Sequence, residues 1–183
     1  MIPLLAQPFL FLRHGETGAN VADVISGSTD DPLSENGHAQ AEAAARLLAA
    51  SRRIASIWHS PLSRARLTAE AVARATGAPL IELAGLAERN WGAWEGLPRS
   101  QMIREATPPG GEGPDTFRAR TRAALAAITG PFPVLIVAHS GTGRELQAML
   151  SDAPPERPGN AEPMEWRQAP DGRWLCTKLP SGL

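Results

Sequence analysis

Polar and ionisable residues gather at four places in the chain, each shortly after an apolar stretch. The first group is Arg13-His14-Gly15-Glu16-Thr17, and the second is His59-Ser60-Pro61 with Arg64 one helical turn later. Glu88-Arg89 forms the third group and His139-Ser140-Gly141 the fourth. If the apolar stretches are strands of one open α/β sheet, these groups meet beyond the carboxyl ends of the strands, where such sheets bind their ligands.

Two arginines, two histidines and a carboxylate at one edge of a sheet have a defined chemical meaning. Guanidinium groups match phosphate oxygens bidentately, and helix N-termini add N–H donors for the same anion. A neutral imidazole beside such a receptor can attack phosphorus, and nearby arginines favour that neutral form because they lower the imidazole pKa. A carboxyl group can protonate the leaving oxygen and then act as a base for water. These residue types predict phosphoryl-transfer chemistry.

Composition narrows the classes of protein that fit. The 183 residues, 43% of them hydrophobic, suit one domain able to bury about 70% of its unfolded surface. A net charge of −1 gives no indication of a nucleic-acid binder. The single cysteine, Cys176, excludes an internal disulfide and a multi-cysteine zinc site, and we expect it to be buried in a late strand. Because the chain has neither an HxH pair nor a Walker-type GKS or GKT motif, we expect no metal and no cofactor.

The N-terminal segment also bears on where the protein works. Residues 1–12 are mostly apolar, but no Lys or Arg precedes them and no small-residue cleavage site follows. No apolar run approaches the roughly 18–20 residues of a membrane span. We therefore expect a loose N-terminus, a buried first strand and a cytoplasmic protein. Its expected partner is a small phosphorylated substrate, with no nucleic acid and no membrane, and the sequence indicates no oligomeric state.

Strand-like and helix-like stretches alternate along the chain, which predicts an α/β fold. The expected strands cover residues 9–12, 54–58, 79–83, 133–138 and an edge strand at 174–178. The expected helices cover residues 34–50, 60–76, 98–106, 117–128 and 142–151, with a loop at 153–163. This pattern predicts a three-layer α/β/α sandwich with a mostly parallel central sheet, in one domain over residues 1–183.

Capping residues predict where several of these helices begin and end. Ser34 is the expected N-cap of the first helix, and Ser60-Pro61 provides an N-cap followed by proline for the second. Gly77 is the expected C-terminal residue of that second helix. Thr142-x-x-Glu145 has the pattern of a capping box at the start of the last helix.

Taken together, these motifs resemble the histidine phosphatase superfamily, in its phosphoglycerate mutase-like branch. The resemblance rests on Arg13-His14-Gly15-Glu16-Thr17 with Asn20, on Ser60-Pro61-Leu62-Ser63-Arg64-Ala65, on Glu88, and on His139 after a hydrophobic strand. It extends to parts of residues 27–41, to residues 91–96 and to Gly159-Asn160-Ala161, and so covers most of the chain.

The resemblance implies a metal-independent phosphatase that hydrolyses phosphate monoesters through a phosphohistidine intermediate. It implies that His14 is the nucleophile and that Glu88 donates and accepts the proton. The phosphoryl oxygens would be bound by Arg13, Asn20, Arg64 and His139. Removing one such donor is expected to slow the reaction roughly 10²–10³-fold.

The chain departs from the family pattern at three places, which affect the expected substrate rather than the expected reaction. Ser140 follows the distal histidine where the family usually has glycine, and His59 replaces a small hydroxyl residue. The usual Gly-Glu-Ser before a long helix is Gly111-Glu112-Gly113.

Other residues keep alternatives open. Glu82, Glu95 and Glu112 compete with Glu88 for the role of the acid. Glu16 is expected to serve a helix N-terminus or the loop. Trp91 and Trp94 are expected to pack together rather than to line the mouth of the pocket.

Two other functions compete with hydrolysis. The family includes phosphoglycerate mutases, which carry a longer insertion between the acid and the distal histidine. Here Glu88 and His139 are only 51 positions apart, and a more open site admits water and favours a phosphatase. A non-catalytic phosphate-binding protein on the same fold is expected to lose His14 or Glu88, and this chain keeps both.

Overall fold

The computed structural model describes residues 2–180 and contains a six-stranded sheet with the order β3-β2-β4-β1-β5-β6. Four strands run parallel to one another, and β5 and β6 continue the sheet in antiparallel fashion beyond β1. The strands are β1 (Phe9–Arg13), β2 (Ser56–His59), β3 (Leu80–Glu82), β4 (Val134–Ala138), β5 (Pro163–Gln168) and β6 (Trp174–Lys178).

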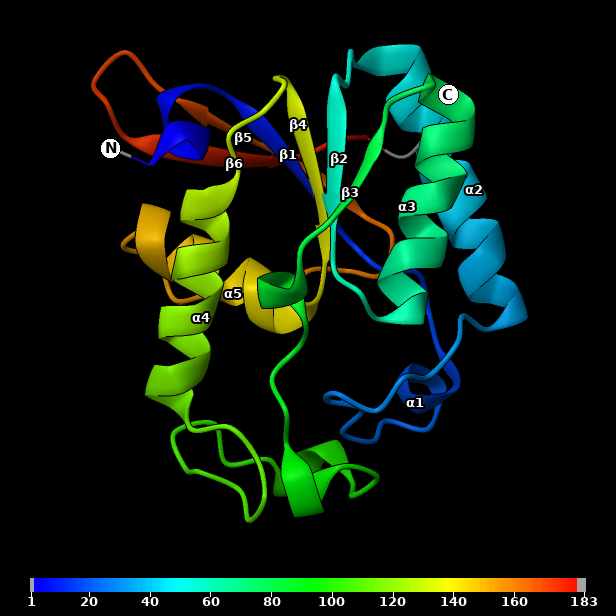
Figure 1. Ribbon diagram of the computed structural model, residues 1–183, viewed down its shortest axis with the longest axis vertical. Coiled ribbons are helices and arrows are strands. Elements are labelled where there is room, and N and C mark those ends of the chain that lie inside the picture. The colour runs from blue at the N-terminus through cyan, green and yellow to red at the C-terminus, as the bar shows by residue number, and fades with distance from the viewer. Residues whose placement is uncertain (1, 181–183) are drawn as a thin grey trace.

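Helices cover both faces of this sheet, as Figure 1 shows: α2 and α3 lie on one side, and α4 and α5 on the other. The α-helices are α1 (Gly18–Val21), α2 (Glu35–Ser51), α3 (Ser63–Thr76), α4 (Pro114–Ala127) and α5 (Ser140–Leu150). Short 3₁₀ turns occur at η1 (Pro3–Ala6), η2 (Ala84–Leu86), η3 (Gly92–Trp94) and η4 (Arg99–Gln101). The predicted three-layer sandwich with a mostly parallel sheet is confirmed. No helix among residues 2–180 is both long and apolar enough to cross a membrane.

The central strands β1 and β4 are buried on both faces, which explains their uninterrupted apolar sequences. Side chains along a strand alternate between its two faces. Leu10 and Leu12 therefore join the hydrophobic cluster under α2 and α3, whereas Phe9 and Phe11 join the cluster under α4 and α5. This double burial fixes the carboxyl ends of β1 and β4 side by side, with Arg13 opposite Ala138.

Two of the predicted caps are present. The Ser34 hydroxyl accepts a hydrogen bond from the Gly37 amide at 3.0 Å, so α2 begins as expected. Gly77 ends α3 with a left-handed φ of 73°.

The other two predicted caps are wrong. Ser60 does not cap α3, which begins at Ser63 after Leu62. The Ser60 hydroxyl instead bonds the His139 ring and the Leu62 amide. The predicted capping box at Thr142 is also wrong. His139 is the N-cap residue and α5 begins directly after β4, so Thr142 lies inside the first turn.

Other differences concern the ends of the chain and one connecting segment. The segment 98–106 forms only the single 3₁₀ turn η4. The expected loose N-terminus is wrong for residues 3–6, which form η1 with Leu4 fully buried. Strand β5 is not among the strands predicted from the sequence, because it begins at a proline and carries charged residues, a composition atypical of a strand. Cys176 is exposed on the edge strand β6 rather than buried.

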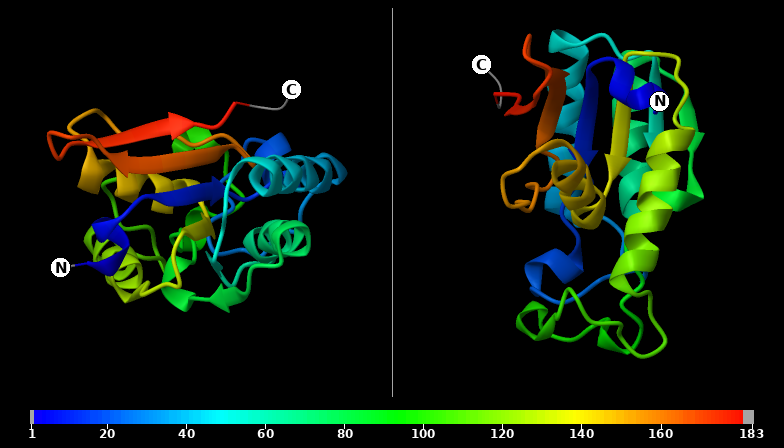
Figure 2. Two further views of the ribbon diagram at one scale, coloured as in Figure 1. Left: turned by 90° about the horizontal axis from the view of Figure 1, so that it is seen from above. Right: turned by 90° about the vertical axis from the view of Figure 1, so that its left-hand side faces the viewer.

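The parallel strands all point their carboxyl ends toward the lower part of the molecule in Figure 1, and Figure 2 shows the arrowheads of β1 and β4 directed there. α1 and the segment 87–112 lie below those ends. The functional residues predicted from the sequence are therefore delivered to the space between the sheet and these segments.

Candidate active site

The two predicted catalytic histidines lie together at the carboxyl ends of β1 and β4. The His14 amide donates to the Ala138 carbonyl at 3.0 Å, which extends the strand pairing by one residue. The His14 and His139 rings have centroids 5.2 Å apart and are tilted by 56°. Both side chains are buried, with residue exposures of 4% and 0%.

Arg13 and Arg64 bring two buried guanidinium groups to the same place. Arg13 ends β1, and its Nη1 donates to the Pro158 carbonyl at 3.0 Å. Arg64 lies in the first turn of α3, and its two terminal nitrogens donate to the carbonyls of Thr29 at 2.8 Å and Gly27 at 2.7 Å. Backbone carbonyls hold both groups in position without neutralising them, so their positive charges remain for an anionic ligand.

The hydrogen bonding of His14 defines which ring nitrogen is free. Its Nδ1 lies 2.6 Å from the Gly15 carbonyl oxygen, which can only accept, so Nδ1 carries the proton and Nε2 the lone pair. Burial holds the pKa of His14 well below its usual 6.5, and the charges of Arg13 and Arg64 lower it further. The ring is therefore neutral near pH 7, with a nucleophilic Nε2.

His139 is oriented by Ser60, a residue for which no catalytic role was expected from the sequence. Its Nε2 lies 2.7 Å from the Ser60 hydroxyl, and that hydroxyl also accepts from the Leu62 amide at 3.2 Å. The only described acceptor for the Ser60 proton is His139 Nε2, so the arrangement that satisfies both groups places the ring proton on Nδ1. Burial, and after it the charge of Arg64, lowers the pKa of His139 well below 6.5.

Glu88 reaches the site after η2 and is held by two backbone amides. The Arg89 amide donates to Oε1 at 2.8 Å, and the Gly141 amide, in the first turn of α5, donates to Oε2 at 3.0 Å. A Cβ added at Gly141 would clash with the Glu88 carboxylate, which explains why glycine suits this position. The amide groups fix the carboxylate beside Arg13, His14 and Arg64, all of which line one cavity.

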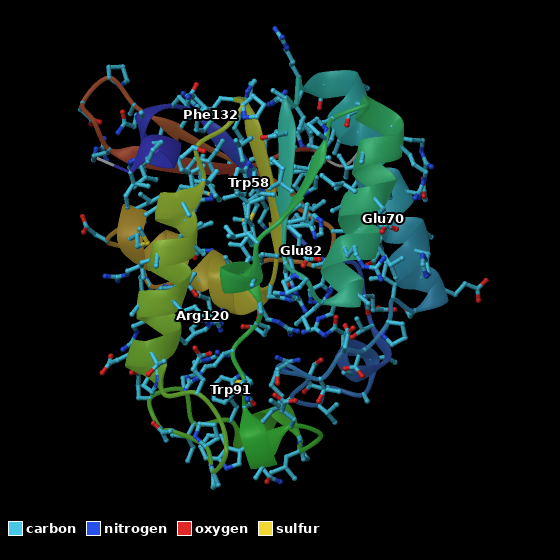
Figure 3. All side chains as sticks on the ribbon, in the orientation of Figure 1. Trp58, Glu70, Glu82, Trp91, Arg120 and Phe132 are labelled. Atoms are coloured by element: carbon cyan, nitrogen blue, oxygen red, sulfur yellow. The ribbon has the colours of Figure 1, made fainter. Side chains whose placement is uncertain are left out.

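The three competing carboxylates lie elsewhere or have structural roles. Glu82 lies on the edge strand β3, as Figure 3 shows. Glu112 forms an ion pair with Arg120 at 2.7 Å. Glu95 accepts hydrogen bonds from the amides of Ser28, Thr29 and Trp91 at 2.8–2.9 Å and so ties the Arg64-binding loop to the segment after β3. Burial alone would raise the pKa of Glu95, but these and two hydroxyl hydrogen bonds together lower it.

Asn20 joins the site from α1. Its Oδ1 accepts from the Asn160 side-chain amide at 2.9 Å and from the Thr17 amide at 3.3 Å. Asn160 also donates to the His14 carbonyl at 3.0 Å. Because both acceptor contacts fall on Oδ1, the Asn20 amide nitrogen is left to donate to a ligand. Asn160 was noticed in the sequence only as part of a motif, without a role.

Thr68 also supports the site, although it was not singled out from the sequence. Its hydroxyl accepts from the Gly15 amide at 3.0 Å and donates to the Arg64 carbonyl at 2.8 Å, so it links the loop after β1 to the start of α3. Glu16 accepts from the Ser34 hydroxyl at 2.8 Å, and thus serves the start of α2 as expected.

A cavity of about 420 Å³ opens from this cluster toward the lower segments. Ser140 lines it, whereas His59 is buried and bonds the Ser60 carbonyl at 2.9 Å. Trp91, labelled below the sheet in Figure 3, lines the cavity and also stacks on Trp94 with centroids 6.0 Å apart. The expectation of packing is thus confirmed, but Trp91 has both roles.

Several donors in this cluster are buried and lack partners. Within residues 2–180, Arg13 Nε, Arg64 Nε and His139 Nδ1 have no hydrogen-bond partner. The other such buried atoms belong to Trp58, Thr121, Thr142, Arg144 and Glu145. Buried polar groups are normally paired, and the residues that carry these three donors are neighbours of His14 through charge or ring contact, so the donors are available to an anion bound beside that ring.

Comparison with known proteins agrees with this geometry. A family model described as Histidine phosphatase superfamily (branch 1) matches residues 9–165. The chain belongs to the histidine phosphatase superfamily. Its similarity to proteins named as phosphatases supports an enzyme that hydrolyses phosphate esters.

Three similar proteins show which members of the superfamily this chain resembles. The glucosyl-3-phosphoglycerate phosphatase of Mycobacterium tuberculosis is 32% identical over 173 residues, spanning 81% of this chain and 77% of that protein. The 2,3-bisphosphoglycerate-dependent phosphoglycerate mutase of Brucella ovis is 28% identical over 176 residues, spanning 84% and 85%. A solved mycobacterial glucosyl-3-phosphoglycerate phosphatase in complex with VO3 superposes with a TM-score of 0.80 at 29% identity, covering 96% of this chain and 100% of that chain.

Proposed function

We propose that the protein hydrolyses phosphate monoesters without a metal and through a phosphohistidine intermediate at His14. The observation that carries this proposal is the set of buried, unpartnered donors on Arg13, Arg64 and His139 around a neutral imidazole whose Nε2 is free. Such donors stabilise charge that develops on a phosphoryl group because they are oriented before the reaction begins.

In the first step, His14 Nε2 forms a bond to phosphorus while the bond from phosphorus to the ester oxygen breaks. The arginine donors, His139 Nδ1 and the Asn20 amide hold the phosphoryl oxygens. Glu88, in its protonated form, gives its proton to the departing oxygen, so the alcohol leaves neutral.

In the second step, a water molecule attacks the phosphorus of phosphohistidine. The Glu88 carboxylate takes a proton from that water, the bond from Nε2 to phosphorus breaks, and inorganic phosphate is released. The same amide contacts from Arg89 and Gly141 position the carboxylate in both steps.

Hydrolysis is favoured over mutase activity by the short connection between the acid and the distal histidine. Between Glu88 and His139 the structure contains only η3, η4, α4 and β4 as regular elements. A site with less cover admits water to the phosphoenzyme, and water then competes with a second alcohol.

Turnover of an aryl phosphate in excess EDTA, combined with rapid acid or alkaline quenching, tests the proposal. Phosphohistidine is acid-labile and base-stable, so the alkaline quench is expected to retain one phosphate per chain on His14. His14→Ala is expected to abolish turnover and labelling with the fold intact. The matched control is His38→Ala, since His38 is exposed on α2.

Three results would overturn the proposal. Folded wild-type protein that turns over no monoester between about pH 5 and 8 favours a binding protein. Labelling that persists in His14→Ala excludes the nucleophile. Transfer of the phosphate to an added phosphoglycerate faster than to water indicates a mutase.

A further inference from the structure

The cavity contains more positive charge than a single phosphoryl group requires. Its lining includes three glutamates, at positions 88, 105 and 145. Against these it has seven arginines, at positions 13, 64, 89, 99, 104, 118 and 144. The chain as a whole has a net charge of −1, so this excess is local to the cavity. Arg13 and Arg64 serve the phosphoryl site described above.

Three of the remaining five arginines have structural partners. Arg89 donates to three backbone carbonyls at 2.6–2.9 Å, including those of Arg104 and Ala106. Arg99 forms an ion pair with Asp23 at 2.9 Å. Arg118 forms ion pairs with both other lining glutamates and with Asp115, most closely with Glu105 at 2.7 Å.

Arg104 and Arg144 differ from these three. In the part of the chain that the structure describes, neither has a carboxylate partner, and the Arg104 side chain makes no hydrogen bond. Arg144 Nη1 donates to the Pro155 carbonyl at 2.8 Å, whereas its Nε is buried without a partner. The carbonyl orients the Arg144 group without neutralising it.

The two groups also repel each other. Burial lowers the pKa of Arg104, and the neighbouring charge of Arg144 lowers it further. Arg157 is affected in the same way, first by burial and then by the charges of Arg99 and Arg144. Like charges held together destabilise the free protein, so a bound anion would relieve an existing cost.

We propose that Arg104 and Arg144 bind a second anionic group of the substrate, so that preferred substrates are phosphate monoesters that also carry a carboxylate or a second phosphate. This inference rests on the proposed function, because it assumes that the ester phosphate lies at His14. Guanidinium forks match both kinds of anion. Both sites lie in the same cavity of about 420 Å³, and this cavity is large enough for one small ligand to occupy both sites together.

Matched substrate pairs test this second site separately from the reaction. Glycerol 3-phosphate and 3-phosphoglycerate differ in one group, an alcohol against a carboxylate, and glucitol 6-phosphate and 6-phosphogluconate repeat that difference at greater length. Fructose 6-phosphate against fructose 1,6-bisphosphate tests a second phosphate. We expect kcat/KM for the anionic member of at least one pair to exceed that of its neutral partner by about tenfold or more.

Arginine substitutions then locate the effect. Arg104→Gln removes a side chain that makes no described hydrogen bond or ion pair, so it is expected to leave the fold and the kcat/KM of the neutral substrates unchanged. In the preferred pair, it is expected to reduce the ratio of kcat/KM for the anionic member to kcat/KM for the neutral member by about tenfold. Arg144→Gln is a second variant with the same expectation. Arg46→Gln is the control, since Arg46 is exposed on α2 and its loss changes the net charge equally.

The outcomes separate the two proposals. If no member of any pair is hydrolysed, the proposed function fails. If all substrates are hydrolysed and the kcat/KM values within each pair are nearly equal, the phosphatase assignment stands and the second anion site is refuted. The same conclusion follows if Arg104→Gln and Arg144→Gln reduce kcat/KM equally for both members of a pair. A ratio that falls as much in Arg46→Gln refutes the site as well, because only long-range charge is then involved.

Discussion

Substituting Ser60 by alanine tests how His139 is oriented. Ser60 is fully buried, and its hydroxyl makes two contacts: with His139 Nε2 at 2.7 Å and with the Leu62 amide at 3.2 Å. Ser60→Ala removes both. The imidazole then has no acceptor-side partner, and its proton is free to move to Nε2.

The size of the effect follows from these contacts. The buried His139 imidazole and the half-buried Leu62 amide lose their partner, which lowers the free energy of unfolding by roughly 1–3 kcal/mol. If His139 ceases to donate from Nδ1, one donor to the phosphoryl group is lost, which bounds the decrease in kcat at roughly 10²–10³-fold. Because part of the variant population keeps the proton on Nδ1, we expect a decrease of about tenfold to a hundredfold.

Nitrogen-15 spectra of labelled histidine report which ring nitrogen of His139 is protonated, and a change in stability alone does not alter this. In the wild type, Nδ1 of His139 is expected to be protonated and Nε2 unprotonated, with the Nε2–H form appearing in Ser60→Ala. Ser60→Thr, which keeps the hydroxyl, is expected to restore part of kcat. In a His139→Ala background, Ser60→Ala is expected to have little further effect on kcat. A wild-type spectrum with Nε2 protonated, or a full additional loss in that background, would refute the reasoning.

Three further predictions follow from individual contacts. Burial keeps the pKa of His14 well below 6.5, so below that pH the unfolded chain binds more protons than the folded one. The free energy of unfolding should therefore fall as the pH decreases below 6.5. Urea titrations at several pH values should show that this free energy depends less steeply on pH in His14→Gln than in the wild type. Glu95→Gln weakens the loop whose carbonyls hold Arg64, so we expect both a lower melting temperature and a lower kcat; unchanged kcat would show that the loop is not needed. Gly141→Ala should displace the Glu88 carboxylate and reduce kcat far more for an alkyl than for an aryl phosphate, and equal losses would argue against Glu88 as the acid.

Much of the fold could be predicted because it follows from local pattern. The apolar runs of β1 and β4 indicate strands buried on both faces, and their polar continuations indicate where a ligand binds. The Ser34 and Gly77 caps depend on neighbouring backbone atoms only, and the sequence predicts them correctly.

The errors arise where distant contacts override local preference. The hydroxyl of Ser60 has the right type and place for a helix cap, yet a histidine 79 positions away engages it. Strand β5 has too many charged and polar residues to be recognised alone and forms because β1 offers it an edge.

The candidate site likewise combines features that the local sequence predicts with features that depend on distant contacts. Residue types and order along the chain identify the groups that the family resemblance assigns to chemistry, and the structure brings His14, Arg13, Arg64, Glu88 and Asn20 to one cavity. The residues that orient them, such as Thr68 and Asn160, act through hydrogen bonds across the fold. The resemblance favours Glu88 over Glu95, and the structure adds that Glu88 lines the cavity whereas Glu95 binds backbone amides of the Arg64-binding loop.

The contacts of Pro158 and Asn160 have a consequence for biosynthesis. A nascent chain translated only as far as the end of α5 already contains His14, Arg64, Glu88 and His139, but it lacks the carbonyl of Pro158 that holds Arg13 and the side-chain amide of Asn160 that orients Asn20. The Arg13 contact spans 145 positions, so it closes only late in synthesis. We therefore expect ribosome-bound fragments to be inactive, with the phosphatase maturing once the segment after α5 has emerged and docked.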